Sequence, residues 1–297
     1  MKNIAQFLLS KNMPKPFFMP LNDGFYDYNY TWPIFLLAID AVQRTLKYKK
    51  EQHVVFTESG GITTEAPPDP YSCMAMQIQS KPDVVFALDF PMKKTRAGID
   101  LTPKTESEKL KTMRWHIQYA KEAVRIKDWF VSEYEHDFEV CPIVQGWDDK
   151  SIAWCASEFA ALECSFFAGG FYGITLADRA DFKRLIVRSQ ERTILVRDII
   201  GRKSWLHALG VTQTPLLVSL KKYITSFDST KPIALAGYNR MTLEDGRDVY
   251  VGSRFGQKTG GLAYSQFDYD VFETGEKGLS IVNFNNFVKY LYKVLWN

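Results

Sequence analysis

The sequence predicts an α/β protein, and more specifically a single (β/α)8 barrel. Short apolar runs of strand length alternate with longer segments of helical spacing, which is typical of a parallel sheet covered by helices. No GxGxxG or Walker-type loop follows a strand, whereas polar residues stand at several strand ends, and this pattern favours a barrel over a doubly wound sheet. We therefore expect one domain over residues 1–297, with a divergent C-terminal part over 230–297.

The expected strands are short apolar runs, each followed by a polar or glycine-rich turn. They lie at 53–57 (HVVFT), 84–88 (VVFAL), 140–144 (VCPIV) and 224–227 (ITSF), with further runs at 165–168 (SFFA) and within 204–210 (SWLHALG). The Pro-rich stretch at 66–70 is expected to be a loop within the domain.

The expected helices occupy most of the segments between these runs. Over 108–130, apolar residues recur at steps of three and four, which defines the buried stripe of an amphipathic helix: Leu110, Met113, Ile117, Ala120 and Val124. Further helices are expected at 33–48, 150–163, 181–199, 215–223 and 284–295.

Composition excludes several classes of protein. Hydrophobic residues make up 46% and charged residues 24%, which excludes a disordered or fibrous chain. The formal charge of +3 permits a polyanionic partner without requiring one. No apolar run approaches the ~18 residues of a membrane span and no signal peptide is visible, so we expect a soluble cytoplasmic protein without a membrane partner. The four cysteines form no CxxC pair, which favours reduced buried thiols and no metal site.

Polar and glycine residues gather at the predicted strand ends. Glu58, Ser59, Gly60 and Gly61 follow the run at 53–57, Asp89 follows 84–88, and Gln145 and Gly146 follow 140–144. Gly169 and Gly170 follow the run at 165–168, His207 and Gly210 lie within 204–210, and Asp228 follows 224–227. In a barrel these positions share the face that carries catalysis. Carboxylates and an amide there can recognise a planar heterocycle and attack a sugar carbon.

Each of these residues alone also has an ordinary structural explanation, such as a helix N-cap, a loop contact or a hydrogen-bonded core histidine. On residue pattern alone, the sequence indicates a barrel enzyme that acts on a glycosidic bond.

The motifs FTESGG (56–61), ALD (87–89), IVQG (143–146), GG (169–170), LHALG (206–210) and FD (227–228) narrow this interpretation. In order and approximate spacing they resemble LTDSGG, LDE, IVQGG, IGG, MGVG and FDC of the tRNA-guanine transglycosylase family. The resemblance extends from about residue 18 to residue 228. It implies a TIM-like barrel that exchanges guanine in a nucleic acid for a 7-deazaguanine base, through a covalent Asp–sugar intermediate and without a cofactor.

The resemblance also implies roles for individual residues. Asp228 matches the family nucleophile, and Glu58 matches the aspartate that acts as general acid and base. Asp89 matches the carboxylate that binds the guanine N1 and amino edge, and Gln145 and the Gly170 backbone match the groups that bind its carbonyl side.

The expected base pocket includes three more residues, Ser59, Gly169 and His207. Ile62 and His207 stand where the family has an aromatic residue and a methionine on either side of the base. A basic run of Lys93, Lys94 and Arg96 follows the Asp89 strand, at the active face of a barrel. It either holds nucleic-acid phosphates or is a solvated charge run.

The chain also departs from the family. DSGG is replaced by ESGG, and no cysteine follows Cys164, so the family zinc site of three cysteines and a histidine cannot form and a barrel without a zinc subdomain is expected. The sequence therefore favours a divergent branch that resembles the DNA 7-deazaguanine transglycosylases. The alternatives are a zinc-free tRNA enzyme, a non-catalytic binding subunit of transglycosylase type and, more remotely, a hydrolytic glycosidase.

Overall fold

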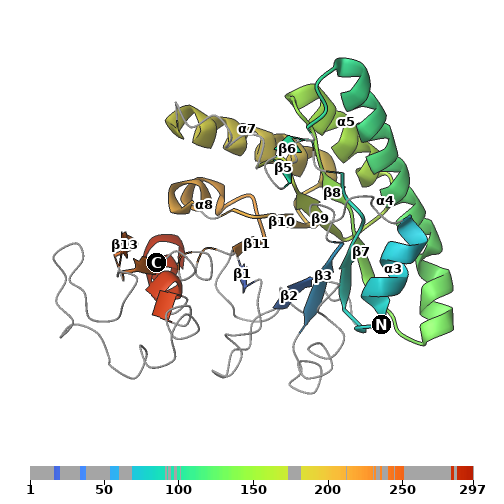
Figure 1. Ribbon diagram of the computed structural model, residues 1–297, viewed down its shortest axis with the longest axis horizontal. Helices are drawn as coiled ribbons and strands as arrows, with labels where there is room; N and C mark the ends of the chain where they lie inside the picture. Colours follow the sequence, from blue (N-terminus) through green and yellow to red (C-terminus); the bar gives the residue numbers. More distant parts are fainter. Residues whose placement is uncertain are drawn as a thin grey trace. The chain divides into compact units, whose positions relative to one another are not determined.

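The structure is a computed structural model, shown in Figure 1. It describes residues 17–20, 34–37, 54–59, 69–90, 92, 95–96, 99–100, 102–172, 182–211, 213–229, 231, 235, 240–243, 245–250, 282–283 and 286–296. The chain divides into two compact units, of which the first comprises Met1–Leu21 with Trp32–Asp228 and the second Asn22–Thr31 with Ser229–Asn297.

Two sheets form the centre of the first unit. One has the order β2 (Ile34–Leu37), β3 (Val55–Glu58), β4 (Val84–Phe86) and β7 (Glu139–Cys141), and the other has the order β1 (Phe17–Pro20), β11 (Ser226–Ser229), β10 (Trp205–Ala208), β9 (Phe166–Gly169) and β8 (Ile143–Val144). Strand pairing is parallel from β2 to β7 and from β8 to β11. The predicted α/β class with parallel strands is therefore confirmed.

The sequence predicted one strand at 140–144, where the structure has two. Pro142 separates β7 from β8, because proline has no N–H to donate to a ladder. The Pro142 carbonyl still accepts a hydrogen bond from the Ala168 N–H at 3.0 Å, and the Cys141 carbonyl accepts one from Ala87 N–H at the same distance. The two sheets consequently meet at this proline.

Five α-helices of the described residues accompany the sheets (Figure 1). They are α3 (Pro70–Ile78), α4 (Glu106–Tyr134), α5 (Asp149–Ala160), α7 (Phe182–Ile200) and α8 (Thr214–Leu220). Each contacts the next one along the chain. The helices predicted at 108–130, 150–163, 181–199 and 215–223 are confirmed with small changes at their ends. Of the helices in the described part of the chain, none is both long and apolar enough to cross a membrane.

One prediction about local structure was wrong, and another is described only at its end. A helix was expected over 33–48, but Ile34–Leu37 forms strand β2, in parallel register with β3. Of the loop expected at 66–70, Asp69 lies outside a helix and accepts a hydrogen bond from the Ser72 N–H at 3.0 Å as the N-cap of α3, and Pro70 is the first residue of that helix. Residues 38–48 and 60–68 lie outside the described residues.

The core of the first unit is a cluster of side chains that the strands direct to one face. It consists of Phe56, Val84, Phe86, Cys141, Ile143, Phe166, Ala168 and Trp205. Side chains two residues apart on a strand share a face. Glu58 therefore lies on the same face of β3 as Phe56, and His207 lies on the same face of β10 as Trp205. The candidate site residues therefore lie one layer beyond an aromatic core, toward the carboxyl ends of the strands.

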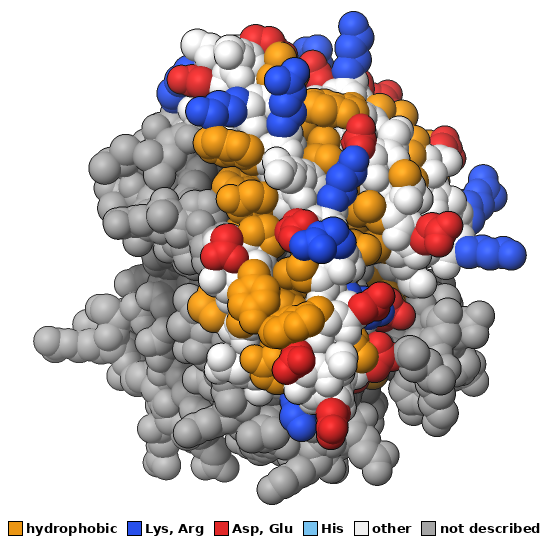
Figure 2. Space-filling model, turned by 90° about the vertical axis from the view of Figure 1, so that its right-hand side faces the viewer, with side chains coloured by type: hydrophobic (Ala, Val, Ile, Leu, Met, Phe, Trp, Pro, Cys, Tyr) orange, Lys and Arg blue, Asp and Glu red, His pale blue; other side chains and the backbone are white. Residues whose placement is uncertain are grey.

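Aromatic contacts attach α3 to α4. The ring of Tyr71 lies 5.3 Å from that of Trp129 and 5.0 Å from that of Phe130, measured between centroids. Tyr71 and Trp129 remain half exposed, and Figure 2 shows hydrophobic side chains gathered between charged ones on one face of the molecule.

The second unit contains a β-hairpin and a C-terminal helical segment. Strands β12 (Arg240–Thr242) and β13 (Asp248–Tyr250) are antiparallel, and Asn283 bonds to the first of them through the Thr242 N–H at 2.7 Å and the Arg240 carbonyl at 3.0 Å. Residues 286–291 are α-helical and lead into a π-helical turn at Tyr292–Trp296, which agrees with the helix predicted at 284–295. This unit carries none of the residues assigned to the expected catalytic or base-binding site.

A candidate active site at the strand ends

The structure brings together polar residues from the carboxyl ends of five strands or the loops that follow them. They are Glu58, Asp89, Gln145, His207 and Asp228, joined by Ser59. Glu58 is partly buried and the others are buried. Residues far apart in the sequence thus form one polar cluster above the aromatic core, as the strand-end pattern predicted.

Asp89 accepts hydrogen bonds from two side chains of the described part of the chain. Its Oδ1 accepts a hydrogen bond from the Ser59 hydroxyl at 3.3 Å, and its Oδ2 accepts one from Gln145 Nε2 at 3.1 Å. The other end of the Gln145 amide, Oε1, is buried and accepts no hydrogen bond from the described residues. An unpaired buried acceptor costs about 1–3 kcal/mol, so an N–H of a bound ligand would stabilise this arrangement.

Gly170 makes room for the Gln145 amide. A Cβ at this position would overlap Gln145 Nε2 and lie 2.7 Å from Gln145 Cδ. The Gly170 N–H donates to the Val144 carbonyl at 2.8 Å, which fixes the backbone beside the amide. Only glycine leaves the amide in its bond to Asp89 without a shift of the side chain.

Glu58 is the acid of the cluster. Burial raises the pKa of its carboxyl to about 8, and the negative charges of Asp228 and Asp89 add to this effect. At pH 7 Glu58 is therefore mainly protonated and can donate a proton, whereas a carboxylate could only accept one.

Asp228 is anchored through one oxygen. Its Oδ1 accepts hydrogen bonds from the Gly210 N–H at 2.7 Å and from His207 Nε2 at 3.0 Å. Gly210 has φ +64°, in the left-handed region that favours glycine, and this conformation aims its N–H at the carboxylate. No hydrogen bond from the described residues reaches Oδ2.

His207 was assigned to the base pocket from the sequence. In the structure its ring is fully buried, with its centroid 5.5 Å from that of Phe86, and its Nδ1 lies 2.8 Å from Ser226 Oγ. The contact between His207 and Asp228 is a feature that the motif comparison did not predict.

His116 is a second residue that the sequence did not single out. The Phe90 N–H donates to its Nδ1 at 3.2 Å, and its Nε2 donates to the Ile143 carbonyl at 2.6 Å. Burial lowers the pKa of His116 to about 4, so the ring is neutral at pH 7 and can accept and donate at once. It thereby connects the loop after Asp89 to the strand before Gln145. The available signal in the sequence was the position of His116 directly before Ile117, which lies on the buried stripe of the predicted helix.

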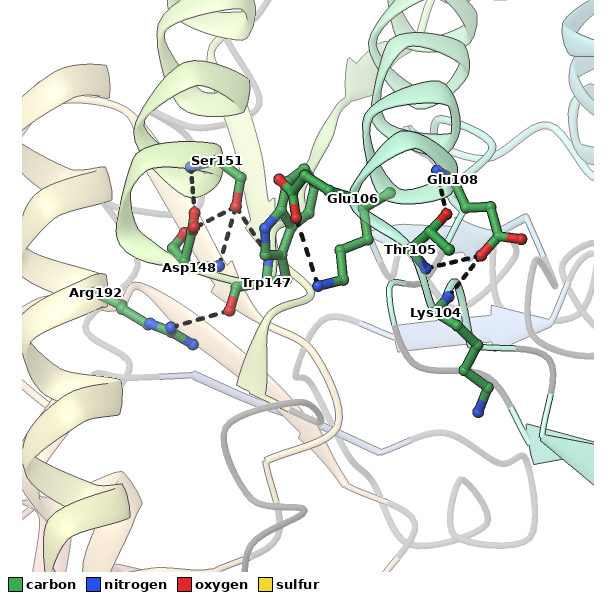
Figure 3. A network of polar contacts seen from close by, with 9 residues as sticks. Lys104, Thr105, Glu106, Glu108, Trp147, Asp148, Ser151 and Arg192 are labelled. Carbon is green, nitrogen blue, oxygen red and sulfur yellow. Dashed lines mark hydrogen bonds and ion pairs between the residues drawn. The ribbon is translucent and has the colours of Figure 1, made fainter.

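The loop after Gln145 is fixed by the start of α5 (Figure 3). The N–H groups of Trp147 and Asp148 both donate to Ser151 Oγ at 3.0 Å, and the Ser151 N–H donates to Asp148 Oδ1 at 2.8 Å. Arg192 donates to the Trp147 carbonyl from α7 at 3.4 Å. This capping box and the arginine leave the Gln145 backbone little freedom.

Gly60, Gly61, Ile62, Lys93 and Lys94 lie outside the described residues, and of Arg96 only the backbone, in strand β5 (Thr95–Arg96), is described. Gly169 ends β9, where a Cβ would lie 3.0 Å from the Phe171 ring. Within the described residues, no group of three or more His, Cys, Asp or Glu side chains is placed to hold a metal ion.

The cluster combines an anchored carboxylate, a protonated carboxyl group and a second carboxylate held beside an amide. These groups can supply a nucleophile, a proton donor and a recognition edge for a ligand rich in N–H donors. The chain matches no protein-family model and no curated protein.

Proposed function

We propose that the protein is a base-exchange transglycosylase, which replaces guanine in a nucleic acid by a 7-deazaguanine base through a covalent bond between Asp228 and the sugar. One observation carries this proposal: an anchored Asp228 lies close enough to Glu58 for its charge to help keep Glu58 protonated. A nucleophilic carboxylate beside a proton donor suits displacement at a glycosidic carbon.

A closed barrel is part of the proposal. The strand order runs from β2 through β3 and β4 to β7, continues past Pro142 into β8, and then follows β9, β10 and β11 to β1. Strand β1 also contacts β2, so the order returns to its start. Counted with β7 and β8 as one interrupted strand, this order supports an eight-stranded ring whose carboxyl ends share one face.

Recognition of the base would depend on Asp89. Its two oxygens can accept the adjacent N1–H and amino N–H of guanine, a donor pair that matches a carboxylate. Gln145 Nε2 already donates one hydrogen to Asp89 and retains a second for the base carbonyl. The buried Oε1 of the same amide favours a ligand that brings a further N–H.

The exchange then balances without a cofactor. Asp228 Oδ2 attacks C1′ of the nucleoside, the bond from C1′ to the base nitrogen breaks, and Glu58 gives its proton to the departing guanine. The incoming base gives a proton to the Glu58 carboxylate as its nitrogen attacks C1′, which releases Asp228. Both carboxyl groups return to their starting states.

DNA is the favoured substrate. Transglycosylases of tRNA use a zinc-bearing subdomain after the nucleophile, and these 297 residues contain no cysteine beyond Cys164. A barrel with the basic residues Lys93, Lys94 and Arg96 can follow a phosphate backbone while the target guanine is turned out of its stack. The longer Glu58 side chain, in place of the family aspartate, favours a sugar without a 2′-hydroxyl.

The test is transfer of labelled guanine into duplex DNA, single-stranded DNA and tRNA, each incubated separately with the protein. We expect label in DNA with the wild type and none with Asp228→Asn, while Ser189→Ala, a buried serine on α7, serves as the matched control. Label in tRNA alone would overturn the DNA assignment. Absence of label from all three polymers would refute the function, and release of guanine without label uptake would indicate a hydrolase.

A further inference from the structure

Behind the proposed nucleophile lies a chain of three hydrogen bonds. Trp205 Nε1 donates to Ser226 Oγ at 2.7 Å, Ser226 Oγ lies 2.8 Å from His207 Nδ1, and His207 Nε2 lies 3.0 Å from Asp228 Oδ1. Trp205, Ser226 and His207 are at most 1% exposed and Asp228 is 3% exposed. The chain therefore runs from the aromatic core to the polar cluster without passing through solvent.

The partners in this chain favour one tautomer of His207: a carboxylate oxygen only accepts, so the bond to Asp228 Oδ1 needs a hydrogen on Nε2. An indole N–H only donates, so Ser226 Oγ accepts from Trp205 and its own hydrogen can point to His207 Nδ1. With Nδ1 as acceptor, the imidazole proton lies on Nε2, which faces the Asp228 carboxylate. The pairing of His207 with Ser226 in the β10–β11 register keeps both side chains on the same face.

We infer that His207 is a positioning residue for Asp228, and that Ser226 and Trp205 fix the tautomer in which it acts. Together with the Gly210 N–H, His207 Nε2–H holds Oδ1, so that the carboxylate presents Oδ2 to the sugar. The role of His207 in base exchange rests on the proposed function, whereas the tautomer of His207 is a property of the protein without substrate.

The same residue types make up the triad of serine hydrolases, but the arrangement here is reversed. In such a triad the serine bonds to Nε2 and the aspartate to Nδ1, whereas here the serine faces Nδ1 and the aspartate faces Nε2. Ser226 is fully buried and occupied by the Trp205 N–H, so no substrate carbon can reach it. Asp228 is the member of the set at the strand end, where a substrate would lie.

Removal of the Ser226 hydroxyl tests the chain most selectively. In Ser226→Ala, His207 Nδ1 loses its donor, and the tautomer with the proton on Nδ1 becomes accessible. That tautomer turns a lone pair toward Asp228 Oδ1, and the charge-assisted bond is lost. We expect kcat for base exchange to fall about 10- to 100-fold, with guanine affinity unchanged because Asp89 and Gln145 are intact.

The experiment combines two readouts. Imidazole ¹⁵N chemical shifts of the protein without substrate report which nitrogen of His207 carries the proton, for wild type, Ser226→Ala and the control Ser189→Ala. The exchange rate and the affinity for guanine are measured on the same proteins and on His207→Gln and His207→Leu. Glutamine retains an N–H near the position of Nε2, so His207→Gln should keep more of kcat than His207→Leu, at equal guanine affinity.

Protonated Nε2 in wild type and in Ser189→Ala, with a shift of the proton toward Nδ1 in Ser226→Ala, supports the inference. Protonated Nδ1 in wild type overturns it, as does base exchange by His207→Leu within twofold of wild type. The NMR result needs no substrate, so a protein that exchanges no base would refute the proposed function and leave the His207 assignment to be decided by the spectrum.

Discussion

The wild type should lose part of its free energy of unfolding as the pH rises above 7, and Glu58→Gln should remove this loss. In the native protein, burial and the charges of Asp228 and Asp89 raise the pKa of Glu58 to about 8, from an ordinary value of 4.5. Between these two values the native state binds one proton more than the unfolded chain. The free energy of unfolding must therefore decrease as the pH rises through this window.

The size of the effect follows from the two pKa values. Each pH unit between them lowers the free energy of unfolding by up to about 1.4 kcal/mol, and the slope flattens as the pH passes about 8. From pH 7 to pH 8.5 the wild type should lose about 1 kcal/mol through this carboxyl group. Glutamine keeps the size and the polar character of the side chain but does not titrate. Its contribution to the free energy of unfolding therefore does not change with pH.

Urea unfolding followed by tryptophan fluorescence at pH 7, 7.5, 8 and 8.5 measures this difference. Wild type and Glu58→Gln share His116 and all four cysteines, so subtracting one curve from the other isolates Glu58. Glu133→Gln, a substitution of an exposed glutamate on α4, should run parallel to the wild type. If Glu58→Gln also runs parallel to the wild type from pH 7 to 8.5, Glu58 is not protonated in the native site and the proposed proton donor is lost.

Three further variants test the base pocket and the basic run. Asp89→Ala should weaken guanine binding by about 10-fold or more in calorimetry, because the donor edge of the base loses its acceptor; equal affinity would remove Asp89 from the pocket. Gly170→Ala places a Cβ against the side-chain amide of Gln145 and should weaken guanine binding with little change in Tm. A large fall in Tm with intact guanine binding would contradict this. Neutralising Lys93, Lys94 and Arg96 together should weaken DNA binding and reduce its salt dependence, and an unchanged salt slope would show that they do not hold phosphates.

The helices were predictable where local signals agree. Helix α4 has an amphipathic stripe and a capping box between Thr105 and Glu108, and both are legible in the sequence. Strand β2 was missed because four apolar residues fit a buried strand and a helix equally well, and only the pairing with β3 decides between them. Helix α3 was missed because prolines indicate a loop, although Pro70 at a helix start is favourable.

The three acidic residues of the candidate site were predictable, whereas the side-chain contacts around them were not. Glu58, Asp89 and Asp228 follow predicted strands, and parallel strands bring their carboxyl ends together. The bond from His207 to Asp228 depends on the register between β10 and β11, which a single sequence does not specify. The unpaired oxygen of Gln145 depends on a side-chain orientation, which has no sequence signal.

We propose that Asp228 forms a covalent bond with the sugar as guanine leaves. Mass spectrometry of the intact protein, acid-quenched after incubation with a guanine-containing DNA oligonucleotide, tests it most directly. We predict an adduct with the mass of the oligonucleotide less guanine, mapped to the peptide that contains Asp228. The adduct should be discharged by an added 7-deazaguanine base and absent in Asp228→Asn. An adduct on another residue, or continued base exchange by Asp228→Asn at the wild-type rate, would contradict it.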